Sequence, residues 1–97
     1  MEADNEILGS IRQAARKYPE IQKILLFGSR ARGDNLERSD YDLAVFTHGQ
    51  PFRQYLSFYN DIDERDALHK FDIVLVEIYA EGKLLQNILK DGVVIYG

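Results

Sequence analysis

Three short apolar runs, separated by segments of helical periodicity, set the strongest limit on how this 97-residue chain can fold. They span residues 21–27, 41–47 and 71–78, and each has the composition of a buried strand, with β-branched residues most frequent in the third. A shorter run at residues 93–96 predicts an edge strand. Strands that alternate with helices predict an α/β architecture, in which helices are layered on a small sheet.

The segments around the strands predict three helices. One covers residues 5–18 and ends before Pro19, a second covers about residues 51–68, and a third lies around residues 84–89. In the second helix the spacing places Phe58 off the apolar stripe, so this ring is expected to be exposed. The residues expected to form the stripe are Phe52, Tyr55, Leu56, Tyr59 and Ile62.

The composition is that of a single small folded domain, residues 1–97, with one core. The absence of cysteine excludes disulfides and zinc–thiolate sites and fits a reducing compartment. No apolar run is long enough to span a bilayer, and no basic segment opens the chain, so we expect neither a membrane span nor a secretory signal and place the protein in the cytoplasm. The net charge of −4 argues against broad binding to DNA or RNA.

The strongest functional signal follows the first apolar run. Gly28 ends that run, and a residue without a Cβ lets the backbone approach a ligand closely. A helical turn over residues 29–33 would point free N–H groups at an anion, with help from the Ser29 hydroxyl and the charges of Arg30 and Arg32. Taken alone, each feature also fits an ordinary turn with Ser29 as N-cap and solvated arginines. The prediction of a phosphate site therefore depends on the residues that come next.

A pair of aspartates follows, where the second strand begins. On a strand Asp40 and Asp42 point to one face and Tyr41 to the other, and two such close carboxylates repel each other unless a cation lies between them. Oxygen ligands of this kind suit Mg²⁺ or Mn²⁺. Asp72 opens the third strand and is the best candidate for a further ligand, if the second and third strands run parallel. The alternative for Asp72 is a structural role, satisfied by a backbone N–H or by Lys70.

Together these residues resemble the signature of the polymerase-β-like nucleotidyltransferase superfamily: a Gly-Ser step, a spacer, an Asp-x-Asp pair and a third Asp on a later strand. The short length and the Arg-Ala-Arg-Gly loop resemble its minimal nucleotidyltransferases, the MNT proteins, which are antitoxins commonly paired with helical HEPN-domain toxins. The resemblance implies the palm fold, an α/β (α+β) arrangement with a small mixed sheet flanked by helices. It makes Gly28 and Ser29 the triphosphate binders and Asp40, Asp42 and Asp72 the catalytic, metal-binding carboxylates.

The same resemblance implies an activity and a partner. The expected reaction is Mg²⁺-dependent transfer of a nucleoside monophosphate, AMP from ATP, to a hydroxyl group, with a tyrosine of a HEPN toxin as the suggested acceptor. Larger family members enclose the nucleotide with a C-terminal helical domain that is missing here, so a second chain is expected to complete the site.

Two other functions are compatible with the sequence. One is an antitoxin that neutralises its partner by occlusion alone, using the aromatic stretch at residues 51–62. The other is transfer to a small molecule such as an aminoglycoside, for which no acceptor pocket can be recognised. His48 and His69 have no spacing typical of a metal site or a catalytic triad, and we interpret them as surface or interface residues.

Overall fold

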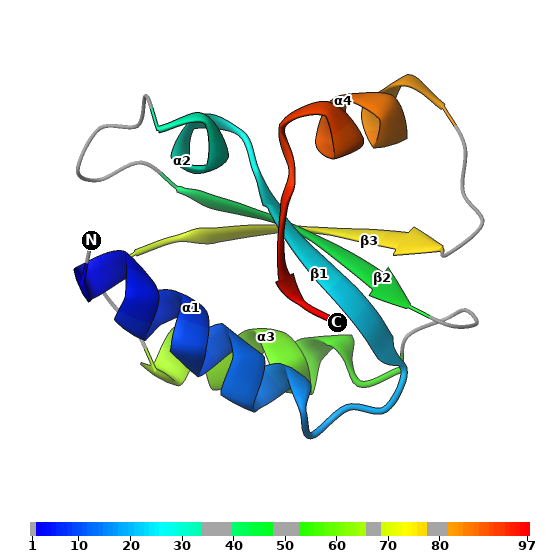
Figure 1. The fold of residues 1–97 in the computed structure, drawn as a ribbon. Helices are drawn as coiled ribbons and strands as arrows, with labels where there is room; N and C mark the ends of the chain where they lie inside the picture. The colour runs from blue at the N-terminus through cyan, green and yellow to red at the C-terminus, as the bar shows by residue number, and fades with distance from the viewer. Residues whose placement is uncertain (1, 34–39, 48–52, 66–68, 78–81) are drawn as a thin grey trace.

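The computed structural model describes residues 2–33, 40–47, 53–65, 69–77 and 82–97. Within these ranges no helix is both long and apolar enough to cross a membrane. Helices lie on both faces of a single sheet (Figure 1). In chain order the elements are α1 (Glu2–Ala15), β1 (Ile21–Phe27), α2 (Ser29–Arg32), β2 (Tyr41–Thr47), α3 (Tyr55–Arg65), β3 (Phe71–Glu77), α4 (Lys83–Asp91) and β4 (Val93–Tyr96).

The sheet is mixed, as predicted. Its strands lie in the order β3-β2-β1-β4, with β1 antiparallel to both of its neighbours and β2 parallel to β3. Helix α3 makes the connection between the two parallel strands, and β4 forms the edge beside β1. Figure 1 shows α1 and α3 on one face of this sheet, and α2 and α4 on the other.

The alternation of side chains along each strand divides the interior into two layers. In β2, Tyr41 and Leu43 pack toward α1 and α3, whereas Ala44 and Phe46 pack toward α4. Asp42 therefore lies on the α4 side of the sheet. The larger core consists of Ile7, Ile11, Ala14, Ala15, Ile21, Ile24, Leu26, Tyr41, Leu43, Val45, Phe58, Ile62, Phe71 and Ile95. The smaller core consists of Leu25, Ala44, Phe46, Val76 and Ile88.

One prediction about α3 is wrong. Phe58 is completely buried, whereas Leu56, assigned to the apolar stripe, is 71% exposed. The reason is that α3 packs against α1 as well as against the sheet, so its buried surface is turned toward α1. There the Phe58 ring meets the Tyr18 ring edge-on, with 5.6 Å between the centroids. Tyr55 and Tyr59 are half-buried beside it.

Other predictions fall outside the described residues. They concern Phe52 and His48, both ends of the expected second helix at residues 51–52 and 66–68, and the last residue of the third strand, Ile78. The described strands β1 and β2 have the predicted bounds.

Polar contacts connect α1 and the turn that follows it to the rest of the fold. Arg12 Nε donates a hydrogen bond of 2.6 Å to the carbonyl oxygen of Ile95 in β4. The Asp61 carboxylate in α3 accepts hydrogen bonds from Arg65 Nε at 2.9 Å and from Lys17 Nζ at 3.0 Å. The bond from Arg65 is the largest cause that lowers the pKa of Asp61, and the bond from Lys17 adds to it.

Candidate active site

Gly28 lies where the chain leaves the sheet and passes the Asp42 carboxylate. Phe27 pairs with Asp42 in the antiparallel ladder, so the next residue crosses directly beside it. The backbone of Gly28 has φ 75° and ψ −155°, and a Cβ added there would overlap Asp42 Oδ2. This position therefore requires glycine, both for its conformation and for the space. The single helical turn α2 follows at once and begins at Ser29.

The three predicted carboxylates come together at the same corner of the sheet. Asp42 and Asp72 are direct neighbours in the parallel pairing of β2 with β3. Asp40 lies directly before β2, and its negative charge acts on Asp42. Asp40 and Asp72 are exposed, and Asp42 is half-buried. The sequence analysis made the role of Asp72 depend on a parallel arrangement of β2 and β3. The two strands are parallel, and Asp72 lies beside Asp42.

These charges influence one another. The pKa of Asp42 is raised, first by burial and then by the negative charges of Asp72 and Asp40, while the positive charge of Arg32 opposes the shift. A cation among the carboxylates would relieve this repulsion, and carboxylate oxygens are the donors that Mg²⁺ prefers. The donor chemistry therefore fits the predicted ion. Among the described residues, however, no three His, Cys, Asp or Glu side chains are arranged to hold a metal, so the metal site stays a prediction.

The two arginines of α2 differ in their surroundings. The Arg30 guanidinium lies over the ring of the buried Tyr41, 4.1 Å from its centroid, in a cation–π contact. Arg32 Nη1 lies 3.6 Å from Asp91 Oδ2 at the end of α4, and its charge also acts on Asp42. Of the pair, Arg32 is thus the one whose charge acts on the carboxylate group. Phosphate binding by either arginine stays a prediction.

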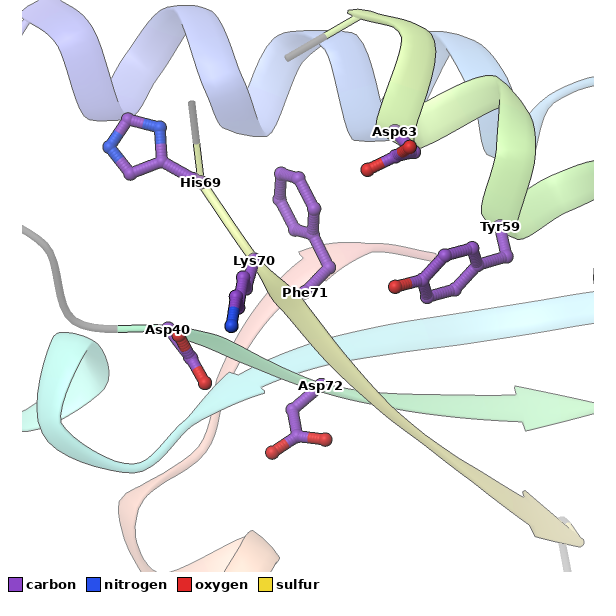
Figure 2. A pocket seen from close by; sticks show the side chains of 7 residues that line it. All are labelled: Asp40, Tyr59, Asp63, His69, Lys70, Phe71 and Asp72. Atoms are coloured by element: carbon purple, nitrogen blue, oxygen red, sulfur yellow. The ribbon is translucent and has the colours of Figure 1, made fainter. Parts of the chain in front are cut away.

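An open hollow of about 610 Å³ extends from this group toward α3 (Figure 2). Asp40 and Asp72 are among the residues that line it. The remaining lining residues were not predicted as part of a site, because nothing in the sequence relates the middle of α3 to the start of β3. They are Tyr59, Asp63, His69, Lys70 and Phe71. His69, interpreted as a surface or interface residue, is half-buried and meets the Tyr41 ring edge-on at 5.5 Å.

The mixed sheet thus brings the Gly28 turn close to Asp42 and Asp72 at one corner. The comparisons with known proteins identify the family. A family model described as polymerase beta, nucleotidyltransferase matches residues 9–97, and the chain belongs to this family. The comparison with curated proteins gave no match.

Solved toxin–antitoxin structures are similar over most of the chain. A toxin–antitoxin structure with AMP-PNP is 26% identical, with a TM-score of 0.65, and the match covers 93% of this chain and 73% of that chain. The MntA–HepT toxin–antitoxin structure is 23% identical, with a TM-score of 0.59 and coverage of 94% and 70%. The tri-AMPylated HEPN toxin of Shewanella oneidensis in complex with its MNT antitoxin gives 23% identity, a TM-score of 0.61 and the same coverage of 94% and 70%. The polymerase-β-like fold and the similarity to MNT antitoxins are thereby confirmed.

Proposed function

We propose that this protein is a Mg²⁺-dependent nucleotidyltransferase that moves AMP from ATP to a hydroxyl group of a HEPN-type toxin, and that it acts in this way as an antitoxin. The observation that carries the proposal is the direct pairing of Asp42 with Asp72, with Asp40 directly before β2 and the Gly28 turn beside them. A toxin–antitoxin structure with AMP-PNP supports ATP as the donor. The AMP-modified HEPN toxin in a complex of the same fold suggests the acceptor.

Each residue has a distinct part in this reaction. Asp40, Asp42 and Asp72 would hold Mg²⁺, or Mn²⁺, which when bound supplies positive charge to the triphosphate. The backbone at Gly28 and the Ser29 hydroxyl bind phosphate oxygens. The acceptor oxygen attacks the α-phosphorus in line, the bond from this phosphorus to the bridging oxygen breaks, and pyrophosphate leaves. Asp72, the exposed acid at the edge, takes the proton of the acceptor hydroxyl.

The proposal is tested by incubating the full chain with its HEPN-type partner, Mg²⁺ and ATP labelled at the α-phosphate. We expect label on the partner, reduced about a hundredfold or more by Asp40→Asn or Asp42→Asn, because charge stabilisation by a metal ion is worth several kcal/mol. Glu64→Gln, an exposed substitution on α3, is the control and should label as the wild type does. Equal labelling by the Asn variants would refute the assignment.

The same variants address the alternative of neutralisation by binding alone. That hypothesis relied on an exposed aromatic surface on the second helix, and Phe58, the ring expected to be most exposed, is buried. We expect a triple Asn variant at positions 40, 42 and 72 to lose protection of cells against the toxin while it still binds the toxin. Full protection by this variant would show that occlusion is sufficient.

A further inference from the structure

The single turn α2 follows Gly28 and has only four residues, too few for a helix that is stable alone. The Gly28 carbonyl oxygen accepts hydrogen bonds of 3.1 Å from the amides of Ala31 and Arg32. The Gly33 amide donates a bond of 2.9 Å to the carbonyl oxygen of Ser29. These three bonds close the turn on itself but do not fix its place. Contacts with the rest of the fold therefore have to hold it beside the carboxylates.

Arg30 makes a contact of this kind. Its side chain is half-buried, and its guanidinium lies over the Tyr41 ring, 4.1 Å from the centroid. The Tyr41 ring belongs to the larger core, on the side of α1 and α3, although α2 itself lies on the other face of the sheet (Figure 1). The next residue, Ala31, packs against the same core. Because neighbouring residues of a strand point to opposite faces, the Arg30 contact lies across β2 from the Asp42 carboxylate.

Tyr41 is a firm support for this contact, because it is 1% exposed and held by its neighbours. Its ring stacks on the Phe71 ring, with 5.6 Å between the centroids and 25° between the planes. Its amide donates a hydrogen bond of 3.0 Å to the carbonyl oxygen of Lys70. Tyr41 and Phe71 are also paired in the parallel ladder, one residue before Asp42 and Asp72. A group that rests on the Tyr41 ring therefore takes its position from the same two strands that place these carboxylates.

We propose that Arg30 is a positioning residue of the candidate active site: by resting on the Tyr41 ring it holds the Gly28–Ser29 turn at the carboxylates, and it does not bind phosphate itself. The proposal rests on the proposed function for the ligand of the turn. It distinguishes Arg30 from Arg32, for which phosphate binding stays a prediction. Without the contact to the ring the turn opens more often, and only molecules with a closed turn bind nucleotide.

The opening of the turn is measured without nucleotide, by hydrogen exchange of the three amides whose bonds close it. We expect Arg30→Met to accelerate their exchange about five- to thirtyfold, the range that corresponds to a partly desolvated cation–π contact. Arg32→Met is the matched control, because it removes the other cation of the turn. The ion pair of Arg32 with Asp91 spans 3.6 Å and is partly exposed, so this variant should change the exchange by no more than about twofold.

Two results of this measurement would overturn the proposal. One is equal exchange of the three amides in Arg30→Met and Arg32→Met, with or without acceleration. The other is an equal acceleration in the ladder of β1 and β2, which would show a general loss of stability in place of a local opening.

A double-mutant comparison shows whether Arg30 acts through the ring. Tyr41→Phe keeps a ring, and in this background Arg30→Met should have its full effect on exchange. Tyr41→Leu removes the ring, and there Arg30→Met should change the exchange by no more than about twofold. An equal effect in both backgrounds would contradict a role through Tyr41. The comparison with Arg32→Met decides the matter where Tyr41→Leu does not fold.

Calorimetric titration with ATP and Mg²⁺ separates positioning from direct phosphate binding. Arg30→Met should weaken ATP binding by no more than the factor by which it accelerates exchange, because only the open fraction fails to bind. A larger loss of affinity would show that Arg30 contacts the phosphates, and the positioning role would be wrong. Failure of the proposed function is distinct, since the wild type would then not bind ATP, while the exchange rates would still decide whether Arg30 holds the turn.

Discussion

Replacing Gly28 with alanine tests how closely the backbone of the candidate active site passes the Asp42 carboxylate. Two costs are expected. The conformation of Gly28, φ 75° and ψ −155°, lies in a region open essentially to glycine alone, where another residue costs about 1–3 kcal/mol. The new Cβ would also overlap Asp42 Oδ2, so the half-buried carboxylate has to move. We expect Gly28→Ala to lower the free energy of unfolding by about 2–4 kcal/mol.

The assay is urea denaturation of the metal-free protein, followed by thermal unfolding with and without Mg²⁺ and ATP. Since Asp42 is displaced, the variant should also lose the stabilisation that the ligands give to the wild type. Gly9→Ala is the control, because it lies inside α1 with nothing within 4 Å of an added Cβ. It should raise stability by about 0.5–1 kcal/mol. The close approach of Gly28 to Asp42 is refuted if the free energy of unfolding of Gly28→Ala lies within about 0.5 kcal/mol of the wild-type value and Mg²⁺ with ATP still raises its unfolding temperature.

Two further predictions concern the packing of α3. Phe58→Ala should lower the free energy of unfolding, measured by urea denaturation, by about 3–5 kcal/mol, because it leaves a cavity in the core. Leu56→Ala should change it by no more than about 0.5 kcal/mol, because Leu56 is exposed. Similar losses in the two variants would contradict the observed orientation of the helix. Asp61→Asn should cost roughly 0.5–1 kcal/mol for each lost ion pair, with Lys17 and with Arg65. The pKa of Asp61 is lowered in the folded state, so this contribution is present above the unfolded pKa of Asp and is lost as the pH falls through the lower folded value. A difference between wild type and variant that does not shrink as the pH falls below the ordinary pKa of Asp would refute this origin.

The sequence predicted most reliably those features that one local pattern determines, namely the bounds of a strand and the face on which its side chains lie. Strands β1 and β2 have the predicted bounds because each is a mostly apolar run closed by polar or turn residues. The alternation of Tyr41, Asp42 and Leu43 between the two faces of the sheet follows from the period of a strand alone. The turn at Gly28 was predictable for the same reason, because a glycine that directly ends a buried strand is typical of a sharp change in chain direction.

Features that depend on how helices and strands pack against one another could not be predicted from the sequence. Both sides of α3 carry aromatic rings, and the packing of Tyr18, in the turn that follows α1, against Phe58 is not visible in the sequence. The register that pairs Asp42 with Asp72 depends on the direction of β3, which the crossover permits but does not require. Asp63 is an ordinary helix-surface acid in the sequence, and only the fold brings it to the hollow.

Because β4 pairs with β1, the sheet can be completed only late in the synthesis of the chain. β1 leads directly into the Gly28 turn, yet one of its two neighbours in the sheet is the strand made last. The carbonyl oxygen that accepts the hydrogen bond from Arg12 belongs to the same late strand, at Ile95, 83 residues further along the chain. On a ribosome adding about 5–20 residues per second, β1 waits several seconds with its β4 side unpaired. A growing chain therefore completes the pairing of its central strand β1 only after β4 has emerged.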